Sequence, residues 1–114
     1  GHFFPRHDIL VTPTVAQLPW AIGEHASAGG NYTARSWTDH LFREAPFTAV
    51  FNVTGQPAIS LPLGRSENGL PFGIQFAASH GREDLLLALA ASLEQARPWP
   101  LIADQPIHPT QTRS

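Results

Sequence analysis

The sequence predicts an α/β fold, and three segments carry the prediction. Residues 8–13 form a short apolar, β-branched run ended by a proline, which is typical of a buried strand that reaches the edge of a sheet. Phe72, Ile74 and Phe76 alternate with small or polar residues, so we expect a strand with these large side chains on one face. Residues 81–95 begin with acidic residues and carry a leucine stripe at helical spacing, which predicts an amphipathic helix.

The remaining elements are predicted from local signals. Residues 33–44 and 47–53 have helical patterns, and Gly55 supplies a C-terminal stop for the second. Residues 57–63 form an apolar run that predicts another strand, and the Asn68-Gly69 pair after it favours a turn with positive φ. One helix after these strands cannot cover both faces of so apolar a sheet. We therefore expect part of the sheet, or a covering layer, to be absent or supplied by another chain.

Two segments show neither a strand nor a helix period. Residues 15–32 are rich in proline, glycine and small side chains, and they predict a long loop that acts as a lid or a pocket wall. Residues 103–114 offer few groups to bury, so they are expected to form a loosely attached tail. The predicted domain therefore covers residues 1–102.

The composition excludes several classes of function. The net charge is −2, and the arginines are scattered singly, which argues against nucleic acid as a partner. No apolar run approaches the roughly 20 residues that cross a bilayer, so no membrane association is expected. The chain has no cysteine, which fits a cytoplasmic protein. All seven basic residues are arginine, so the chain also has no lysine.

Self-contained catalytic or metal chemistry is not predicted. The six histidines include no pair at the i, i+4 spacing of helical ligands, so we expect neither a metal nor a cofactor. The sequence contains no Gly-x-Ser-x-Gly motif, the sharp turn that would expose a serine nucleophile. Ser60, between Ile59 and Leu61 of a predicted strand, is interpreted as a small residue within the sheet.

The order of five motifs resembles the closing part of amidase signature enzymes. The motifs are DILVTPT (8–14), PFT (46–48), NVTGQPAISLPLG (52–64), GLPFGIQF (69–76) and GREDLL (81–86). The likeness covers roughly residues 3–99. It is greatest to bacterial amidases that act on apolar or linear amides, including aminohexanoate-oligomer hydrolases.

This resemblance implies an α/β/α sandwich around a mixed sheet, of which only the C-terminal strands and helices are present. It also implies amide hydrolysis through an acyl-serine, with a nucleophilic serine, a bridging serine and a lysine base that lie upstream in the family. Arginine cannot replace that base, because its pKa above about 12 keeps it charged. No catalytic residue is therefore assigned to this chain.

In such enzymes the closing part supplies core packing and some of the substrate-pocket wall. The candidate substrate-binding residues, by the resemblance, are Thr12, Pro13, Thr14, Trp37, Phe47, Asn52, Gln56 and Pro57. Amidotransferase subunits of the family resemble this chain but have an aspartate where Ala45 stands. The substitution favours an apolar acyl or amine group in this pocket.

Two hypotheses follow. In the first, the chain is the C-terminal part of a longer amidase, acts on a small-molecule amide only within that enzyme, and is inactive alone. In the second, it is a stand-alone interaction module derived from an amidase tail. Such a module would pair through its exposed sheet, for example as a homodimer that buries Phe72, Ile74 and Phe76.

Overall fold

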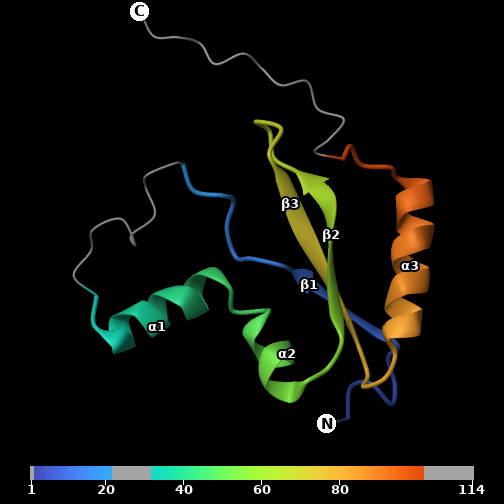
Figure 1. Ribbon diagram of the computed structural model, residues 1–114, viewed down its shortest axis with the longest axis horizontal. Helices are drawn as coiled ribbons and strands as arrows, with labels where there is room; N and C mark the ends of the chain where they lie inside the picture. Colours follow the sequence, from blue (N-terminus) through green and yellow to red (C-terminus); the bar gives the residue numbers. More distant parts are fainter. Residues whose placement is uncertain (1, 22–31, 102–114) are drawn as a thin grey trace, which may run out of the picture.

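The computed structural model describes residues 2–21 and 32–101 (Figure 1). The predicted tail, residues 103–114, and residues 22–31 of the predicted loop lie outside the described residues. All six predicted elements are present with boundaries shifted by a few residues. In chain order they are β1 (Ile9–Pro13), α1 (Ala34–Glu44), α2 (Ala49–Thr54), β2 (Ala58–Arg65), β3 (Pro71–Ala78) and α3 (Glu83–Ala96).

The three described strands form an antiparallel sheet in the order β1-β3-β2. The register aligns Thr12 of β1 and Ser60 of β2 with Gln75 of β3, so these residues lie in one row across the sheet. β2 extends two residues beyond the predicted strand, and its register shifts between Leu61 and Gly64. Both β1 and β2 are edge strands within the part of the chain that the structure describes.

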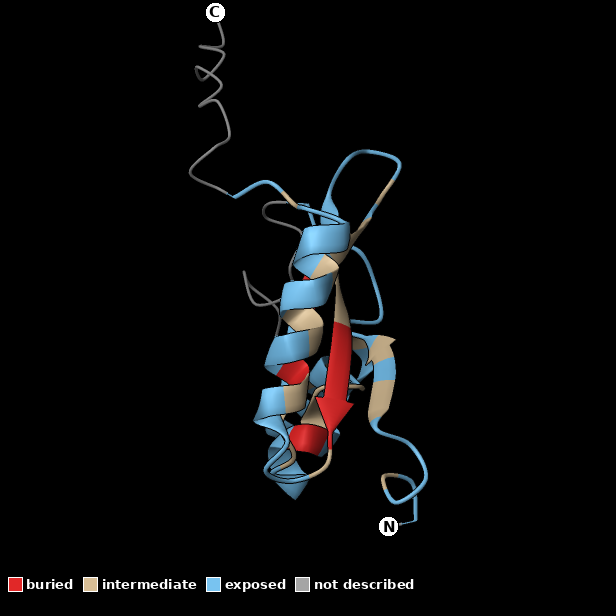
Figure 2. Cartoon of the chain, turned by 90° about the vertical axis from the view of Figure 1, so that its right-hand side faces the viewer, coloured by how far each residue is buried: buried red, intermediate tan, exposed pale blue. Residues whose placement is uncertain are grey.

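α3 covers one face of this sheet (Figure 1). Leu86 of α3 lies in the hydrophobic core with Leu61, Phe76 and Ala78. Ile74 packs against this core. The helix covers this face because its leucines recur at helical spacing and form a single apolar stripe. Figure 2 shows the result: the outer surface of α3 is mostly exposed, whereas the end of β3 is buried.

This packing corrects the surface expected for a homodimer. The sequence interpretation placed Phe72, Ile74 and Phe76 on an exposed face, but Phe76 is buried and Ile74 packs against the core beneath α3. Ile74 and Phe76 are therefore not a bare surface for a partner. The error arose because the period of two shows which side chains share a face and does not show what covers that face.

α2 lies on the opposite side of the sheet from α3, and α1 lies on that same side but farther from the strands (Figure 1). Phe51 of α2 is buried, and so is Ala77 of β3. Gly55 ends α2 in the left-handed conformation, with φ of 73°, as the sequence predicted. The α/β class and the layered arrangement expected from the resemblance are confirmed.

Two further local predictions are confirmed. The turn between β2 and β3 has Gly69 at φ of 80°, and the backbone N–H of Ser66 donates to the Leu70 carbonyl at 2.9 Å. Glu83 and Asp84 lie in the first turn of α3, where they interact favourably with the helix dipole. Across residues 2–21 and 32–101, no helix has the length and apolar character needed to span a bilayer.

Candidate functional site

A pocket of about 340 Å³, lined mainly by polar side chains, opens on the side of the sheet away from α3. We call it the polar pocket. It lies where α2 faces the sheet, near the end of β1. Its lining residues are Thr14, Thr48, Phe51, Asn52, Gln56, Ala58, Ile59, Ser60 and Gln75.

Two hydroxyl groups meet across the central strand in this pocket. Thr14 follows β1 and Ser60 lies in β2, and their Oγ1 and Oγ atoms are 2.5 Å apart. They approach over Gly73 of β3, whose carbonyl also accepts a 3.1 Å bond from the Thr14 backbone N–H. A Cβ at position 73 would lie 2.6 Å from Thr14 Oγ1 and would also clash with Ser60 Oγ. The glycine therefore makes room for the hydroxyl pair.

Gln75 forms the buried polar centre of the same face, with 5% of its surface exposed. Its Nε2 donates to Thr12 Oγ1 at 3.0 Å and to the Phe47 carbonyl at 3.3 Å. These bonds tie β3 to β1 and to the segment before α2. Since a buried amide without partners would destabilise the fold, this network fixes the position of one wall.

The other wall is held by bonds within and after α2. Asn52 Nδ2 donates to the Thr48 carbonyl at 3.2 Å, and Thr54 Oγ1 donates to Gln56 Oε1 at 3.1 Å. His80 Nε2 lies 2.9 Å from the Thr54 carbonyl, which connects the end of α2 to the segment after β3. The amide groups of Asn52 and Gln56 are thus held at the pocket by local bonds.

None of the described residues that line the polar pocket carries a formal charge. Its hydroxyl and amide groups can donate and accept hydrogen bonds, and Phe51 adds apolar surface. Such a lining suits a neutral polar group with an apolar neighbour better than a carboxylate or an ammonium group. Within the described ranges, no three His, Asp or Glu side chains gather as a metal site would require.

Of the eight candidate substrate-binding residues, Thr14, Asn52 and Gln56 line the polar pocket. Thr12 and Phe47 lie just behind it, where both accept bonds from Gln75. The structure thus brings five of the candidates to one side of the sheet.

The other three candidates lie apart from the pocket lining. Pro13 is exposed and alternates in direction with Thr12 and Thr14 along the strand. Pro57 is half-buried, and its carbonyl accepts a 3.1 Å bond from the Ala78 backbone N–H. Trp37 belongs to an aromatic cluster on α1, with its ring centroid 5.5 Å from that of Tyr32 and 5.9 Å from that of His40.

Six lining residues were not among the candidates: Thr48, Phe51, Ala58, Ile59, Ser60 and Gln75. Ser60 and Gln75 carry its central polar groups. The alternation along β3 placed Gln75 opposite the large apolar side chains, and this signal could have marked it as part of a polar face. Ser60 had no comparable signal, because its role depends on a contact with Thr14, which precedes it by 46 residues and meets it across β3.

Comparison with known proteins assigns the chain to a class. The Amidase family profile matches residues 1–87, and the chain belongs to this family of hydrolases. It is 45% identical over 107 residues to 6-aminohexanoate-cyclic-dimer hydrolase of Pseudomonas sp. (strain NK87), covering 91% of this chain and 22% of that protein. It is 35% identical over 99 residues to an acylamidase of Rhodococcus erythropolis, covering 85% and 20%.

The solved structures agree with the sequence relatives. A structure of 6-aminohexanoate cyclic dimer hydrolase complexed with substrate matches with a TM-score of 0.66 and 45% identity, over 81% of this chain and 20% of that one. The chain therefore spans about a fifth of the length of these relatives. The resemblance expected from the five motifs is confirmed.

Proposed function

We propose that this chain is the C-terminal part of an amidase that hydrolyses carboxylic amide bonds through an acyl-serine intermediate. In this proposal residues 1–102 belong to the amidase domain, and the polar pocket forms one wall of the substrate site. The nucleophilic serine, the bridging serine and the lysine base lie on polypeptide outside these 114 residues. The lack of cysteine favours a cytoplasmic location.

The observation that carries the proposal is the uncharged lining of the polar pocket. An amide substrate is neutral, with one carbonyl acceptor and at most two N–H donors, and the pocket offers hydroxyl and amide partners for both kinds of group. Phe51 provides an apolar contact beside them. An apolar amide can therefore bind without any charged side chain of the pocket lining losing its hydration.

The side chains available in this chain decide which steps it can take part in. Acyl transfer needs a nucleophile activated by a base, and the family resemblance assigns that base to lysine, which this chain lacks. Arginine stays protonated at working pH and cannot accept the proton. This chain contributes binding and orientation, and it does not move the proton.

The first test compares two proteins. The 114-residue chain and a longer product that includes the preceding coding sequence are assayed for release of nitroaniline from acyl nitroanilides. The proposal predicts turnover by the longer protein only. Turnover by the 114-residue chain itself would overturn it.

The pocket assignment is tested within the longer protein. Asn52→Ala or Gln56→Ala should raise KM by roughly threefold to tenfold with a smaller change in kcat, since each removes a neutral hydrogen bond made to the substrate. Gln95→Ala, an exposed amide on α3, is the matched control and should leave KM unchanged. An unchanged KM in both pocket variants would exclude the pocket from substrate binding.

The alternative function is a stand-alone interaction module. It is favoured by the two edge strands of the described sheet and by exposed apolar side chains, of which Val53 of α2 has 87% of its surface accessible. Sedimentation equilibrium of the 114-residue chain separates the two functions. A concentration-dependent dimer without amidase activity in the longer protein would support the module.

A further inference from the structure

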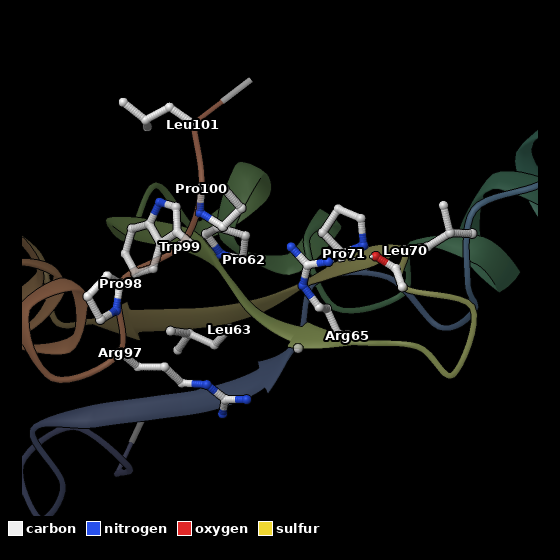
Figure 3. Close-up of a pocket in the computed structure, with 12 residues that line it drawn as sticks. Pro62, Leu63, Arg65, Leu70, Pro71, Arg97, Pro98, Trp99, Pro100 and Leu101 are labelled. Atoms are coloured by element: carbon white, nitrogen blue, oxygen red, sulfur yellow. Dashed lines mark hydrogen bonds between the residues drawn. The ribbon is translucent and has the colours of Figure 1, made fainter. Parts of the chain in front are cut away.

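A second and larger cavity lies apart from the polar pocket. Its volume is about 790 Å³, and it is formed by the β2–β3 turn and the segment that follows α3 (Figure 3). We call it the arginine cavity. Its lining residues are Pro62, Leu63, Gly64, Arg65, Gly69, Leu70, Pro71, Arg97, Pro98, Trp99, Pro100 and Leu101.

The charges of this lining have one sign. Among the described residues that line the cavity, Arg65 and Arg97 are the charged ones, and none is a carboxylate that would neutralise them. Arg65 Nη1 donates to the Gly69 carbonyl at 3.2 Å, which leaves its other N–H groups available. Within the described part of the chain, no hydrogen bond or ion pair involves the Arg97 guanidinium. In Figure 3 the Arg65 side chain runs toward Pro71 and Leu70, whereas the Arg97 side chain runs below Leu63, so the two guanidinium groups occupy separate parts of the lining.

The rest of the lining is apolar and partly fixed by the core. Trp99 and Leu63 both pack against the hydrophobic core beneath α3, so one wall has a defined position. Four prolines and the exposed Leu70 and Leu101 extend the apolar surface toward solvent. A ligand that suited this cavity would have an apolar body and an anionic end.

We propose that the arginine cavity binds small amphiphilic monocarboxylates. The guanidinium group of Arg65 or that of Arg97 binds the carboxylate, because a planar guanidinium matches the two carboxylate oxygens in geometry and charge. Leu63, Trp99 and the prolines contact the alkyl or aryl chain. The inference is independent of the proposed function, since it concerns binding at a separate cavity, although the acid released from an apolar amide belongs to the same chemical class.

The test titrates three probes of equal chain length into the ¹⁵N-labelled 114-residue chain. Octanoate should shift the indole N–H signal of Trp99 and the backbone signals of Gly64 and Leu70. Octanamide should bind at least about fivefold more weakly, because it cannot form a charge-assisted bond, and octylammonium should be repelled. Binding of octanoate should weaken as salt is added.

Variants connect the binding to the two arginines. The double variant Arg65→Ala with Arg97→Ala should weaken octanoate binding at least about tenfold, and Arg97→Lys should retain part of the affinity. Arg43→Ala on α1 is the matched control and should bind as the original chain does. Preserved signal dispersion in each spectrum shows that the variants remain folded.

Three results would overturn the inference. One is equal affinity for octanoate and octanamide, which would mean that the cavity recognises apolar chains alone. Another is unchanged octanoate binding in the folded double variant. The third is a set of shifts at Thr48, Asn52 and Ser60, which would place the carboxylate in the polar pocket instead.

Discussion

The two faces of the sheet differ in how completely this chain covers them. Under α3, Leu61, Phe76 and Leu86 form an apolar core that the chain closes by itself. On the other face, Ser60 and Gln75 point polar groups toward a pocket that remains open. Adjacent residues of the same strands supply both faces, because side chains alternate along a strand.

Under the proposed function, the difference divides stability and recognition between the two faces of the sheet. The apolar face gives the free energy that holds the strands and α3 together. The polar face uses that rigid support to hold hydroxyl and amide groups in position. Substitutions under α3 should therefore change folding most, and substitutions on the polar face should change local geometry and binding.

The largest expected effect is on the α3 face. Leu86→Ala should lower the free energy of unfolding by roughly 2–5 kcal/mol, because the side chain is 3% exposed and its removal leaves a cavity. Leu87→Ala is the matched control, with the same chemistry on a side chain that is 65% exposed, and should change stability by less than about 0.5 kcal/mol. Urea unfolding followed by circular dichroism measures both. Equal losses in the two variants would contradict the assignment of the core.

The next effect tests the hydroxyl pair over Gly73. Gly73→Ala should cost about 1–3 kcal/mol, because the added methyl group clashes with the Thr14 and Ser60 hydroxyls. A double-mutant cycle with Ser60→Ala should show a loss smaller than the sum of the single variants, since that change removes one clashing atom. Additive losses would mean that the two positions do not meet as described.

Gln75 provides a smaller test of the polar face. Gln75→Met keeps the size of the side chain but leaves the Phe47 carbonyl and the Thr12 hydroxyl without their bond, so it should cost about 1–2 kcal/mol. Thr12→Val removes one of these two bonds and should cost less. If Thr12→Val destabilised the chain as much as Gln75→Met, the bond to Phe47 would have no measurable role. Urea midpoints of the two variants decide this.

The smallest effect concerns pH. A side-chain hydrogen bond from Arg82, at 3.1 Å, lowers the pKa of Asp84 below its ordinary value of 3.8. A lowered folded-state pKa gives stability that is present above the unfolded-state pKa and lost as the pH falls through the folded-state value. Asp84→Asn should therefore be slightly less stable than the original chain at neutral pH, and the two should converge in strong acid.

Glu83→Gln is the control for the pH effect, since Glu83 shares the first turn of α3. Both substitutions remove a negative charge near the helix N-terminus, but only one removes the bond to Arg82. Thermal midpoints measured between about pH 7 and about pH 2 would show the difference. A larger loss for Glu83→Gln would assign the effect to the helix dipole alone.

Much of the α3 face could be predicted from sequence because its signals are local. The leucine spacing of residues 81–95 gave the helix, and the alternation at Phe72, Ile74 and Phe76 gave the apolar side of β3. Neither signal showed that these two surfaces pack together. The expected dimer surface was wrong for that reason.

The polar pocket was harder to predict because its contacts join distant segments. Gln75 reaches Thr12 across 63 residues of sequence, and Ser60 reaches Thr14 across 46. The register that aligns them depends on the pairing of β3 with both neighbours and on the shift between Leu61 and Gly64. Thr14, Asn52 and Gln56 were found through the family resemblance, whereas Ser60 required the pairing itself.

The most direct test of the account locates the nucleophile. The longer protein is treated with a serine-reactive fluorophosphonate and digested, and the modified peptide is identified by mass spectrometry. The account predicts that the label lies on a serine outside these 114 residues and that labelling abolishes amide hydrolysis. A label on Ser60, or on any other serine of this chain, with the same loss of activity would contradict it.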